Sequence, residues 1–216
     1  MTLKIRESWV IIALLAAGLA GGLALNRQLS PSNDTGAAAR VEGLLWPNPP
    51  AVAEFSLTAK DGTDFTRADL DGRWSLMFFG FTHCPDVCPV TLRELDAVLD
   101  GYDVSSEAPQ VVFVSVDPAR DDAETVRRYV EFFDPAFQGV TGSAAAIGAF
   151  TRDLGVIAVP GETDESGDYN VDHTASILVV GPDARVVGIL SAPHSAAAIR
   201  RRFEAIRAFV ESQREA

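Results

Sequence analysis

The sequence predicts an α/β domain built on a parallel sheet and preceded by one transmembrane helix. Nearly continuous apolar runs at residues 74–81 and 111–116 are typical of central strands that are buried on both faces. A segment with helical apolar spacing follows each run, and strands that alternate with helices imply a parallel sheet with crossover helices. The membrane helix is predicted from residues 8–25, which carry no charge.

Length and charge limit the classes of protein to which this chain can belong. Its 216 residues suffice for one domain of ordinary size, roughly 100 to 150 residues, plus an appendage. The formal net charge of -12 argues against a nucleic-acid surface, because binding to phosphates needs clustered Lys and Arg side chains. We therefore expect no nucleic-acid partner.

The uncharged N-terminal segment is long enough to cross a bilayer. Its eighteen residues, Ser8 to Leu25, span roughly 27 Å as a helix, close to the thickness of a hydrocarbon core. Lys4 and Arg6 precede the segment, whereas Arg27 is the only basic residue in the dozen that follow. This asymmetry predicts that the short N-terminus stays inside and that the bulk of the chain is exported, to the periplasm in a bacterium.

The chain is expected to divide into three parts. Residues 1–25 are the membrane anchor, residues 26–51 form a flexible tether rich in small and polar residues, and residues 52–216 form the folded domain. A cleaved signal peptide is the alternative to a retained anchor. The uncharged run exceeds the usual apolar region of a signal peptide, which favours the anchor.

The remaining elements of the domain follow from periodicity and capping. Asp61-Gly62 between two short segments predicts a hairpin, and Asp122 and Ser143 are placed to cap two helices. The predicted order is hairpin 55–57/63–65, strand 74–81, helix 87–99, strand 111–116, helices 121–133 and 143–154, hairpin 176–180/185–190 and helix 195–210. This is the order of a thioredoxin-like fold with an N-terminal β-hairpin and an additional helical insertion.

The two cysteines of the chain, Cys84 and Cys88, lie where a predicted buried strand turns into a helix. We expect their spacing to place both sulfurs on one side of a single helical turn, where the helix N-terminus stabilises thiolates. Two soft thiolates suit Cu(I). A disulfide is the structural alternative, but closing so short a loop would stabilise the fold little. Zinc is disfavoured because a structural zinc site closes with four ligands.

A third copper ligand has to come from elsewhere, and the chain has three histidines. His83 adjoins Cys84, but its side chain should leave the strand end in another direction. His194 precedes the last helix, where a capping or surface role is expected. His173 precedes the strand 176–180, whose start lies beside the cysteine-bearing helix in a thioredoxin-like fold. We therefore predict that the metal ligands are the two cysteines and His173.

Three blocks of the sequence resemble the signature blocks of the Sco/SenC family of copper proteins. They are residues 79–89 (FGFTHCPDVCP), 115–121 (SVDPARD) and 171–174 (VDHT). The resemblance implies a thioredoxin-like fold, copper binding by the two cysteines and His173, and a role in assembling the binuclear copper site of cytochrome c oxidase subunit II. Phe81 and Thr174 depart from the family's frequent Tyr and Ser, and neither change removes a ligand.

Two acidic residues near these blocks have roles that the sequence leaves open. Asp86, between the cysteines, either tunes the thiols or satisfies amides of the first helical turn. Asp117, at the end of a central strand, either lies near the metal loop and tunes it or caps the turn into the next helix. The acidic loop 159–170 leads into His173 and is expected to be a flap that metal binding orders.

Two functions remain open for this site. The first is a metallochaperone that receives copper, as Cu(I) or also Cu(II), from a donor chaperone and passes it to cytochrome c oxidase subunit II or another copper-accepting protein. The second is a thiol-disulfide oxidoreductase whose catalytic pair, Cys84 and Cys88, reduces the cysteines of the accepting protein. His173 separates the two functions, because a three-coordinate copper site needs this imidazole and a reductase does not.

Overall fold

The computed structural model describes residues 41–102, 108–165 and 167–215. The predicted anchor, residues 1–25, and the predicted tether up to residue 40 lie outside these ranges. Within the described ranges, each helix is too short or too polar to span a bilayer. The chain from Val41 onward forms one compact unit.

A seven-stranded mixed sheet forms the centre of this unit. The strands lie in the order β2-β1-β5-β4-β3-β8-β9. β3 pairs with β4 and β4 with β5 in parallel, and the other neighbouring pairs are antiparallel. The bounds are β1 Ser56–Ala59, β2 Asp64–Thr66, β3 Ser75–Gly80, β4 Gln110–Ser115, β5 Gln138–Thr141, β8 Ile177–Val180 and β9 Val186–Leu190. The two predicted central strands, β3 and β4, are therefore neighbours inside the sheet.

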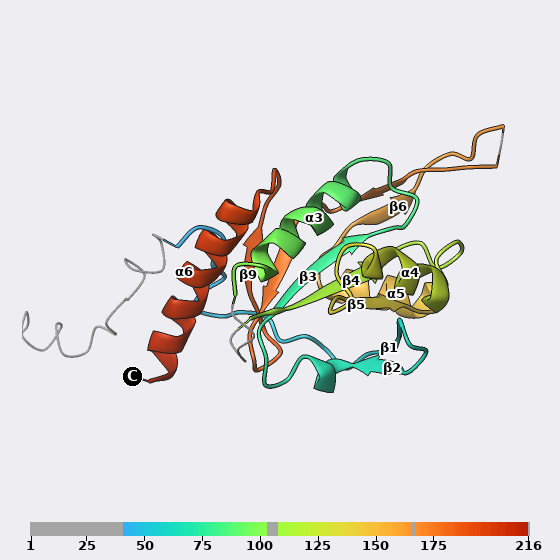
Figure 1. The fold of residues 1–216 in the computed structure, drawn as a ribbon. Helices are drawn as coiled ribbons and strands as arrows, with labels where there is room; N and C mark the ends of the chain where they lie inside the picture. The colour runs from blue at the N-terminus through green and yellow to red at the C-terminus, as the bar shows by residue number, and fades with distance from the viewer. Residues whose placement is uncertain (1–40, 103–107, 166, 216) are drawn as a thin grey trace, which may run out of the picture. The chain divides into compact units, whose positions relative to one another are not determined.

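The helices of the described residues cover both faces of the sheet, and α3 and α6 lie side by side (Figure 1). Their bounds are α3 Val87–Leu99, α4 Ala123–Glu131, α5 Ala144–Asp153 and α6 Ala196–Arg214, with a 3-10 turn, η1, at Arg67–Asp69. Side chains alternate along a strand, so Phe78 and Phe79 of β3 mark the two faces. Phe78 contacts Phe113, which contacts Tyr129 of α4, whereas Phe79 contacts Phe150 of α5. α4 and α5 therefore lie on opposite faces.

The predicted helix starts are confirmed in detail. α3 has the bounds that the sequence predicts. The Asp122 carboxylate accepts a hydrogen bond from the Thr125 amide at 2.7 Å at the start of α4, and the Ser143 hydroxyl accepts one from the Ala146 amide at 3.2 Å at the start of α5. Local capping chemistry thus determines where these helices begin.

The predicted element order lacks three strands, β5, β6 and β7. Of these, β5 lies between β1 and β4 in the seven-stranded sheet. The helical insertion of the prediction is therefore a helix, a strand and a helix. β5 was missed because its sequence, QGVT, contains no apolar run. Gly139 is required there by packing: a Cβ at this position would lie 2.7 Å from Val126 and 3.1 Å from Val130 of α4.

Part of the predicted tether packs against the folded unit. Leu44 forms an isolated bridge with Gly188 of β9, and the Leu45 amide donates to the Val187 carbonyl at 2.8 Å. The Trp46 ring meets the Phe209 ring of α6 edge to face at 5.3 Å. Residues 44–51 thus cover the edge of β9, which would otherwise offer unpaired backbone groups.

The predicted flap, residues 159–170, has regular structure at its two ends. β6 (Ala158–Pro160) and β7 (Val171–His173) pair antiparallel as a separate two-stranded sheet. The pairing places Ala158 opposite His173, and the Gly161 amide donates to the Asn170 carbonyl at 2.8 Å. Figure 1 shows this ribbon reaching away from the sheet. Each strand has three residues, too few for a periodic signal in the sequence.

Candidate metal centre

Cys84 lies in the loop between β3 and α3, not on the helix. The expectation that both sulfurs lie on a single helical turn is wrong, because α3 begins at Val87. Pro85 explains the difference, since a residue that precedes proline is disfavoured in helical conformation. The Cys84 sulfur instead accepts a hydrogen bond from the Cys88 amide at 3.4 Å. It therefore occupies the position of a capping acceptor at the helix N-terminus.

Cys88 lies in the first turn of α3 and is 0% exposed, whereas Cys84 is 9% exposed. The end of β3 leaves room for the Cys88 side chain because residue 80 is a glycine. A Cβ on Gly80 would lie 2.7 Å from the Cys88 sulfur and 2.9 Å from the Phe113 ring. The strand end and the helix start are thus fitted to each other around this sulfur.

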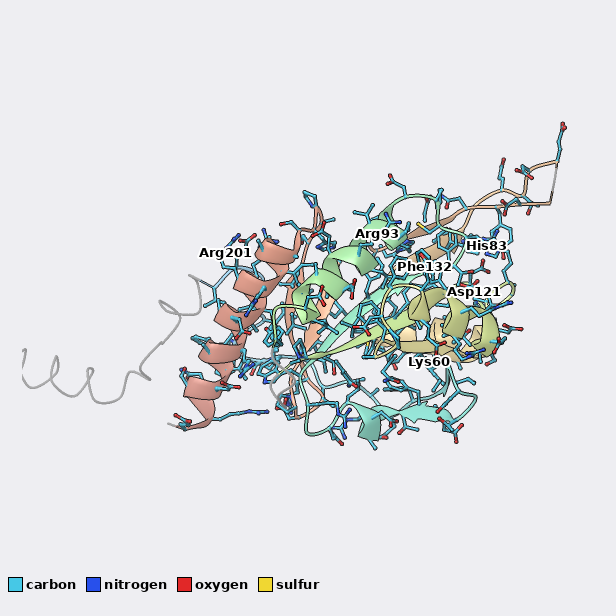
Figure 2. The ribbon with its side chains drawn as sticks, in the orientation of Figure 1. Lys60, His83, Arg93, Asp121, Phe132 and Arg201 are labelled. Carbon is cyan, nitrogen blue, oxygen red and sulfur yellow. The ribbon has the colours of Figure 1, made fainter. Side chains whose placement is uncertain are left out.

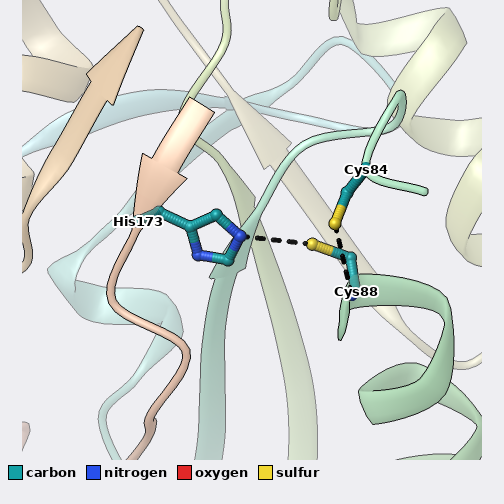
Figure 3. Close-up of side chains that lie close together, drawn as sticks. All are labelled: Cys84, Cys88 and His173. Atoms are coloured by element: carbon teal, nitrogen blue, oxygen red, sulfur yellow. Dashed lines mark hydrogen bonds between the residues drawn. The ribbon is translucent and has the colours of Figure 1, made fainter. Parts of the chain in front are cut away.

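His173, the last residue of β7, brings its imidazole to the two sulfurs (Figure 3). Its Nε2 lies 3.5 Å from the Cys88 sulfur, and its Nδ1 lies 3.2 Å from the Thr174 carbonyl oxygen. A carbonyl oxygen only accepts hydrogen bonds, so Nδ1 carries the proton and the Nε2 lone pair faces the sulfurs. The rings of Phe78 and Phe81 meet the imidazole edge to face and restrict its rotation.

The three donor atoms are close enough to share one metal ion. The two sulfurs and one imidazole nitrogen all lie within 4.8 Å of one another. Metal bonds of about 2.0 Å to nitrogen and 2.3 Å to sulfur need donors roughly 3.5 to 4 Å apart in a three-coordinate site. Among the described residues, this is the group of His, Cys and acidic side chains whose ligand atoms converge in this way.

The pKa values of the two thiols are shifted in opposite directions. The hydrogen bond donated by the Cys88 thiol lowers the pKa of Cys84 to about 4, against the effect of burial, and the backbone amides of Asp86 and Cys88 add to this shift. The same hydrogen bond and burial raise the pKa of Cys88. The metal-free pair therefore holds one thiolate, on Cys84, beside one thiol, on Cys88.

The other two histidines lie outside this group, as expected. The His83 side chain is 49% exposed, and its Nδ1 lies 3.1 Å from the Thr82 hydroxyl and 3.8 Å from Asp121. Figure 2 shows His83 and Asp121 close together on one side of the domain. His194 donates from Nε2 to the Ala175 carbonyl at 2.7 Å. Neither ring approaches the two sulfurs.

Asp121 is a site-supporting residue that sequence reasoning missed. Its carboxylate is fully buried and accepts hydrogen bonds from the Thr82 amide at 2.9 Å, the Thr82 hydroxyl at 2.5 Å and the Ser115 hydroxyl at 2.6 Å. It thereby ties the loop before Cys84 to the end of β4. The signal in the sequence was position. Thr82 lies just after β3 and Ser115 ends β4, and polar side chains at the ends of neighbouring parallel strands lie close together.

Asp86 and Asp117 have different places in the structure. Asp86 is the N-cap residue of α3, but its side chain makes no capping hydrogen bond, so the predicted role of satisfying amides through that side chain is wrong. Asp86 lines a cavity of about 220 Å³ with Cys84 and His173. Asp117 is 4% exposed and lies outside the three-donor group; its carboxylate binds Arg120 and Tyr169.

Comparison with known proteins identifies the family. The SCO1/SenC family model matches residues 47–208. The chain belongs to the SCO1/SenC family. The resemblance seen in the three sequence blocks is thereby confirmed. Solved Sco structures that superpose on this chain also confirm the α/β thioredoxin-like fold.

Three relatives illustrate how far the similarity of this SCO1/SenC chain extends. The mitochondrial SCO2 homolog of Danio rerio is 44% identical over 132 residues, which is 60% of this chain and 47% of the relative. The crystal structure of Arabidopsis thaliana ScoI with copper bound has a TM-score of 0.67 at 34% identity, and the match covers 73% of this chain and 99% of that one. The solution structure of apo Sco1 from Thermus thermophilus has a TM-score of 0.67 at 36% identity and covers 77% of this chain and 95% of that one. The matches span about half the length of the mitochondrial SCO2 homologs of Danio rerio and Mus musculus and of the mitochondrial SCO1 homolog of Homo sapiens.

Proposed function

We propose that the chain is a copper metallochaperone whose cargo, Cu(I), is bound by Cys84, Cys88 and His173. The observation that carries this proposal is the convergence of two sulfurs and one imidazole nitrogen within 4.8 Å. Sulfur ligands and a low coordination number suit Cu(I). The relative from Arabidopsis thaliana, with 34% identity, was solved with copper bound, which supports copper as the metal here.

The cargo would pass to a copper-accepting protein by ligand exchange. We propose the binuclear copper site of cytochrome c oxidase subunit II as the recipient and a separate copper chaperone as the donor. Three ligands leave a coordination position for an incoming donor atom. Cys84 and His173 border the cavity of about 220 Å³, whereas Cys88 is fully buried, so an incoming ligand would meet the Cys84 and His173 side of the ion first.

The proposed setting is the exported face of a membrane. Residues 1–25 would anchor the chain, residues 26–51 would connect it, and residues 52–216 would carry the site. The uncharged run at residues 8–25 and the basic residues before it support this layout. In a bacterium the domain would face the periplasm, where it could reach a copper site on the same membrane.

Copper titration of the full chain tests the metal site, with His173→Ala as the decisive variant. Loss of one of three ligands should lower the Cu(I) affinity by at least about tenfold, since even residues that support ligands contribute that much. X-ray absorption should show an imidazole beside two sulfurs in the wild type only. His83→Ala and His194→Ala are matched controls and should bind as the wild type does. Equal affinity and equal spectra for His173→Ala would refute the three-ligand site.

A thiol-disulfide oxidoreductase is the second candidate, and the acidity of Cys84 favours it. The Cys84 thiolate would attack a sulfur of the target's disulfide, forming a mixed disulfide and releasing one target thiolate. Cys88 would then lose its proton and attack the Cys84 sulfur, releasing the second target thiolate. The target is reduced and the chain keeps a Cys84–Cys88 disulfide.

Trapping separates this candidate from copper transfer. Cys88→Ser should accumulate a mixed disulfide between Cys84 and a disulfide-bonded target peptide, because the second attack is lost. Cys84→Ser should form none, and His173→Ala should react as the wild type does. Absence of any trapped adduct in Cys88→Ser would exclude the reductase, whatever the copper titration shows.

A further inference from the structure

We propose that Arg120 is a positioning residue that holds the segment bearing His173 against the loop bearing Cys84. The proposal deepens the proposed function, because it concerns how the same three donor atoms are kept together. Arg120 lies in the turn between β4 and α4 and is not a ligand. The structure places its guanidinium between one aromatic ring from each of the two segments.

The first observation is the position of the guanidinium over these two rings. The guanidinium carbon lies 3.7 Å from the centroid of the Tyr169 ring, four residues before His173. It lies 5.7 Å from the centroid of the Phe81 ring, three residues before Cys84. The Phe81 ring in turn meets the His173 imidazole edge to face at 5.9 Å. Arg120 therefore bridges the histidine segment and the thiol loop directly.

Hydrogen bonds fix the guanidinium in this place. Its Nε donates to Asp117 Oδ2 at 2.5 Å, and its Nη1 donates to Asp168. The other oxygen of Asp117 accepts from the Tyr169 hydroxyl at 2.7 Å. We call Asp117, Arg120, Asp168 and Tyr169 the Arg120 cluster. Asp168 and Tyr169 belong to the histidine segment, residues 168–173, and Asp117 and Arg120 belong to the turn after β4.

Burial decides which of these contacts matter. Asp168 is 64% exposed, so its ion pair with Arg120 is screened by water and contributes little. Asp117 is 4% exposed and the Arg120 side chain 17%, so their pair is largely removed from solvent. Removal of one partner from a buried pair leaves an uncompensated charge, which is strongly unfavourable. The Asp117 bonds and the stack on Tyr169 are therefore the contacts that hold the segment.

The backbone offers little alternative support for the position of His173. Within the described residues, β6 and β7 pair only with each other and form a sheet separate from the seven-stranded one. The ribbon joins the seven-stranded sheet through residues 174–176, which lead into β8, and side-chain contacts add to this link in orienting it relative to the cysteines. By fixing Tyr169, the Arg120 cluster places the third donor before the metal arrives, so less ordering is needed at the moment of binding.

Hydrogen exchange of the metal-free full chain tests the role of Arg120 without copper. In Arg120→Gln, the amides of residues 171–174 should exchange about tenfold faster, the effect of losing one hydrogen bond to a charged group. The amides of α3 should keep their wild-type rates. Arg120→Lys should restore protection only in part, because an ammonium lacks the planar fork that stacks and binds at two points.

Arg200→Gln is the matched control, because Arg200 also stacks on a tyrosine, Tyr102, at 4.9 Å, but belongs to α6. It should leave the exchange of residues 171–174 unchanged. Tyr169→Phe keeps the ring and removes only the bond to Asp117, so it should speed exchange less than Arg120→Gln does. If Arg120→Gln does not fold, and therefore exchanges faster at all amides, Tyr169→Phe replaces it as the test variant. Wild-type exchange at residues 171–174 in Tyr169→Phe would then overturn the proposal.

Copper binding adds a readout that a merely structural role would not change. In Arg120→Gln, X-ray absorption of the Cu(I)-loaded chain should show a weaker imidazole contribution with both sulfurs retained. An undiminished imidazole contribution together with wild-type exchange would refute the positioning role. If the wild type bound no Cu(I) while Arg120→Gln still sped exchange, the proposed function would fail and the positioning role would stand.

Discussion

Cys84 and Cys88 differ in protonation although they share one helix end. Cys84 precedes the helix, and its sulfur accepts a hydrogen bond from the Cys88 amide at 3.4 Å. The Cys88 side chain is fully buried and lies against Gly80. Hydrogen bonding from Cys88 lowers the pKa of Cys84 to about 4, and the pKa of Cys88 is raised. At neutral pH the thiolate of the pair is therefore the sulfur of Cys84, which is the group that the proposed metal capture or disulfide attack would use.

Alkylation with iodoacetamide should reveal this difference. Because the pKa of Cys84 is lowered, its thiolate persists as the pH falls, and its alkylation rate should be nearly constant between about pH 6 and 8. An ordinary thiol, with a pKa near 8.5, would react about tenfold more slowly for each unit of pH lost. Mass spectrometry of the modified peptide provides the measurement. Cys88 is the internal control and should remain largely unmodified; equal rates at the two sulfurs would contradict the assignment.

The second prediction at this scale concerns Gly80. Gly80→Ala would force a Cβ to within 2.7 Å of the Cys88 sulfur, so the helix start or the strand end must shift. We expect a loss of about 1 to 3 kcal/mol in the free energy of unfolding, measured with urea, and weaker Cu(I) binding.

Gly148→Ala is the matched control for Gly80→Ala. The nearest atom to an added Cβ there is the end of the Arg152 side chain, at 3.3 Å. Alanine is also the better helix former by about 1 kcal/mol, so this variant should be as stable as the wild type or more stable. A Gly80→Ala chain that unfolds at the wild-type urea concentration would show that the sulfur has room to move.

At the scale of elements, the helices could be predicted and three strands could not. α3, α4 and α5 carry local signals: apolar spacing, and for the last two a capping side chain at Asp122 and Ser143. β5, β6 and β7 form because of the strands with which they pair. The four residues of β5 gain their structure from β1 and β4, and the three residues of β7 from β6. The stabilisation comes from the neighbouring strand, so it is not visible as a hydrophobic pattern in a segment of three or four residues.

The same limit applied to the candidate site. The convergence of Cys84, Cys88 and His173 could be predicted because two of them adjoin a helix start and the family blocks contain all three. The roles of Asp121 and Arg120 depend on contacts across 39 and 48 residues of sequence, with Thr82 and Asp168. Neither partner can be chosen without knowing the order of strands. The support of the site therefore required the structure.

α6 provides a prediction about an element that stabilises the fold without touching the site. Phe203 is fully buried, and its ring meets the Trp74 ring edge to face at 5.7 Å. Phe203→Ala should lower the free energy of unfolding by about 3 to 5 kcal/mol in urea denaturation. The pH dependence of Cys84 alkylation should not change under native conditions. A large change in that profile would mean that α6 also shapes the thiol pair.

At the scale of the whole molecule, the compact unit begins at Val41. A chain that starts there should fold and stay in the soluble fraction after expression. The full chain should instead sediment with membranes and resist extraction with alkaline carbonate, as an apolar span would. Immunoblotting of the two fractions provides the measurement. Recovery of the full-length chain in the soluble fraction, without proteolysis, would count against an anchor at residues 1–25.

The separate sheet formed by β6 and β7 has a consequence for the release of an ion. The imidazole and the sulfurs belong to parts of the fold that share no strand pairing within the described residues. Moving His173 outward therefore breaks no hydrogen bond of the seven-stranded sheet. In the proposed copper transfer, a recipient would displace the imidazole nitrogen first while both sulfurs still hold the cation, so that the ion would pass in steps without being released into water.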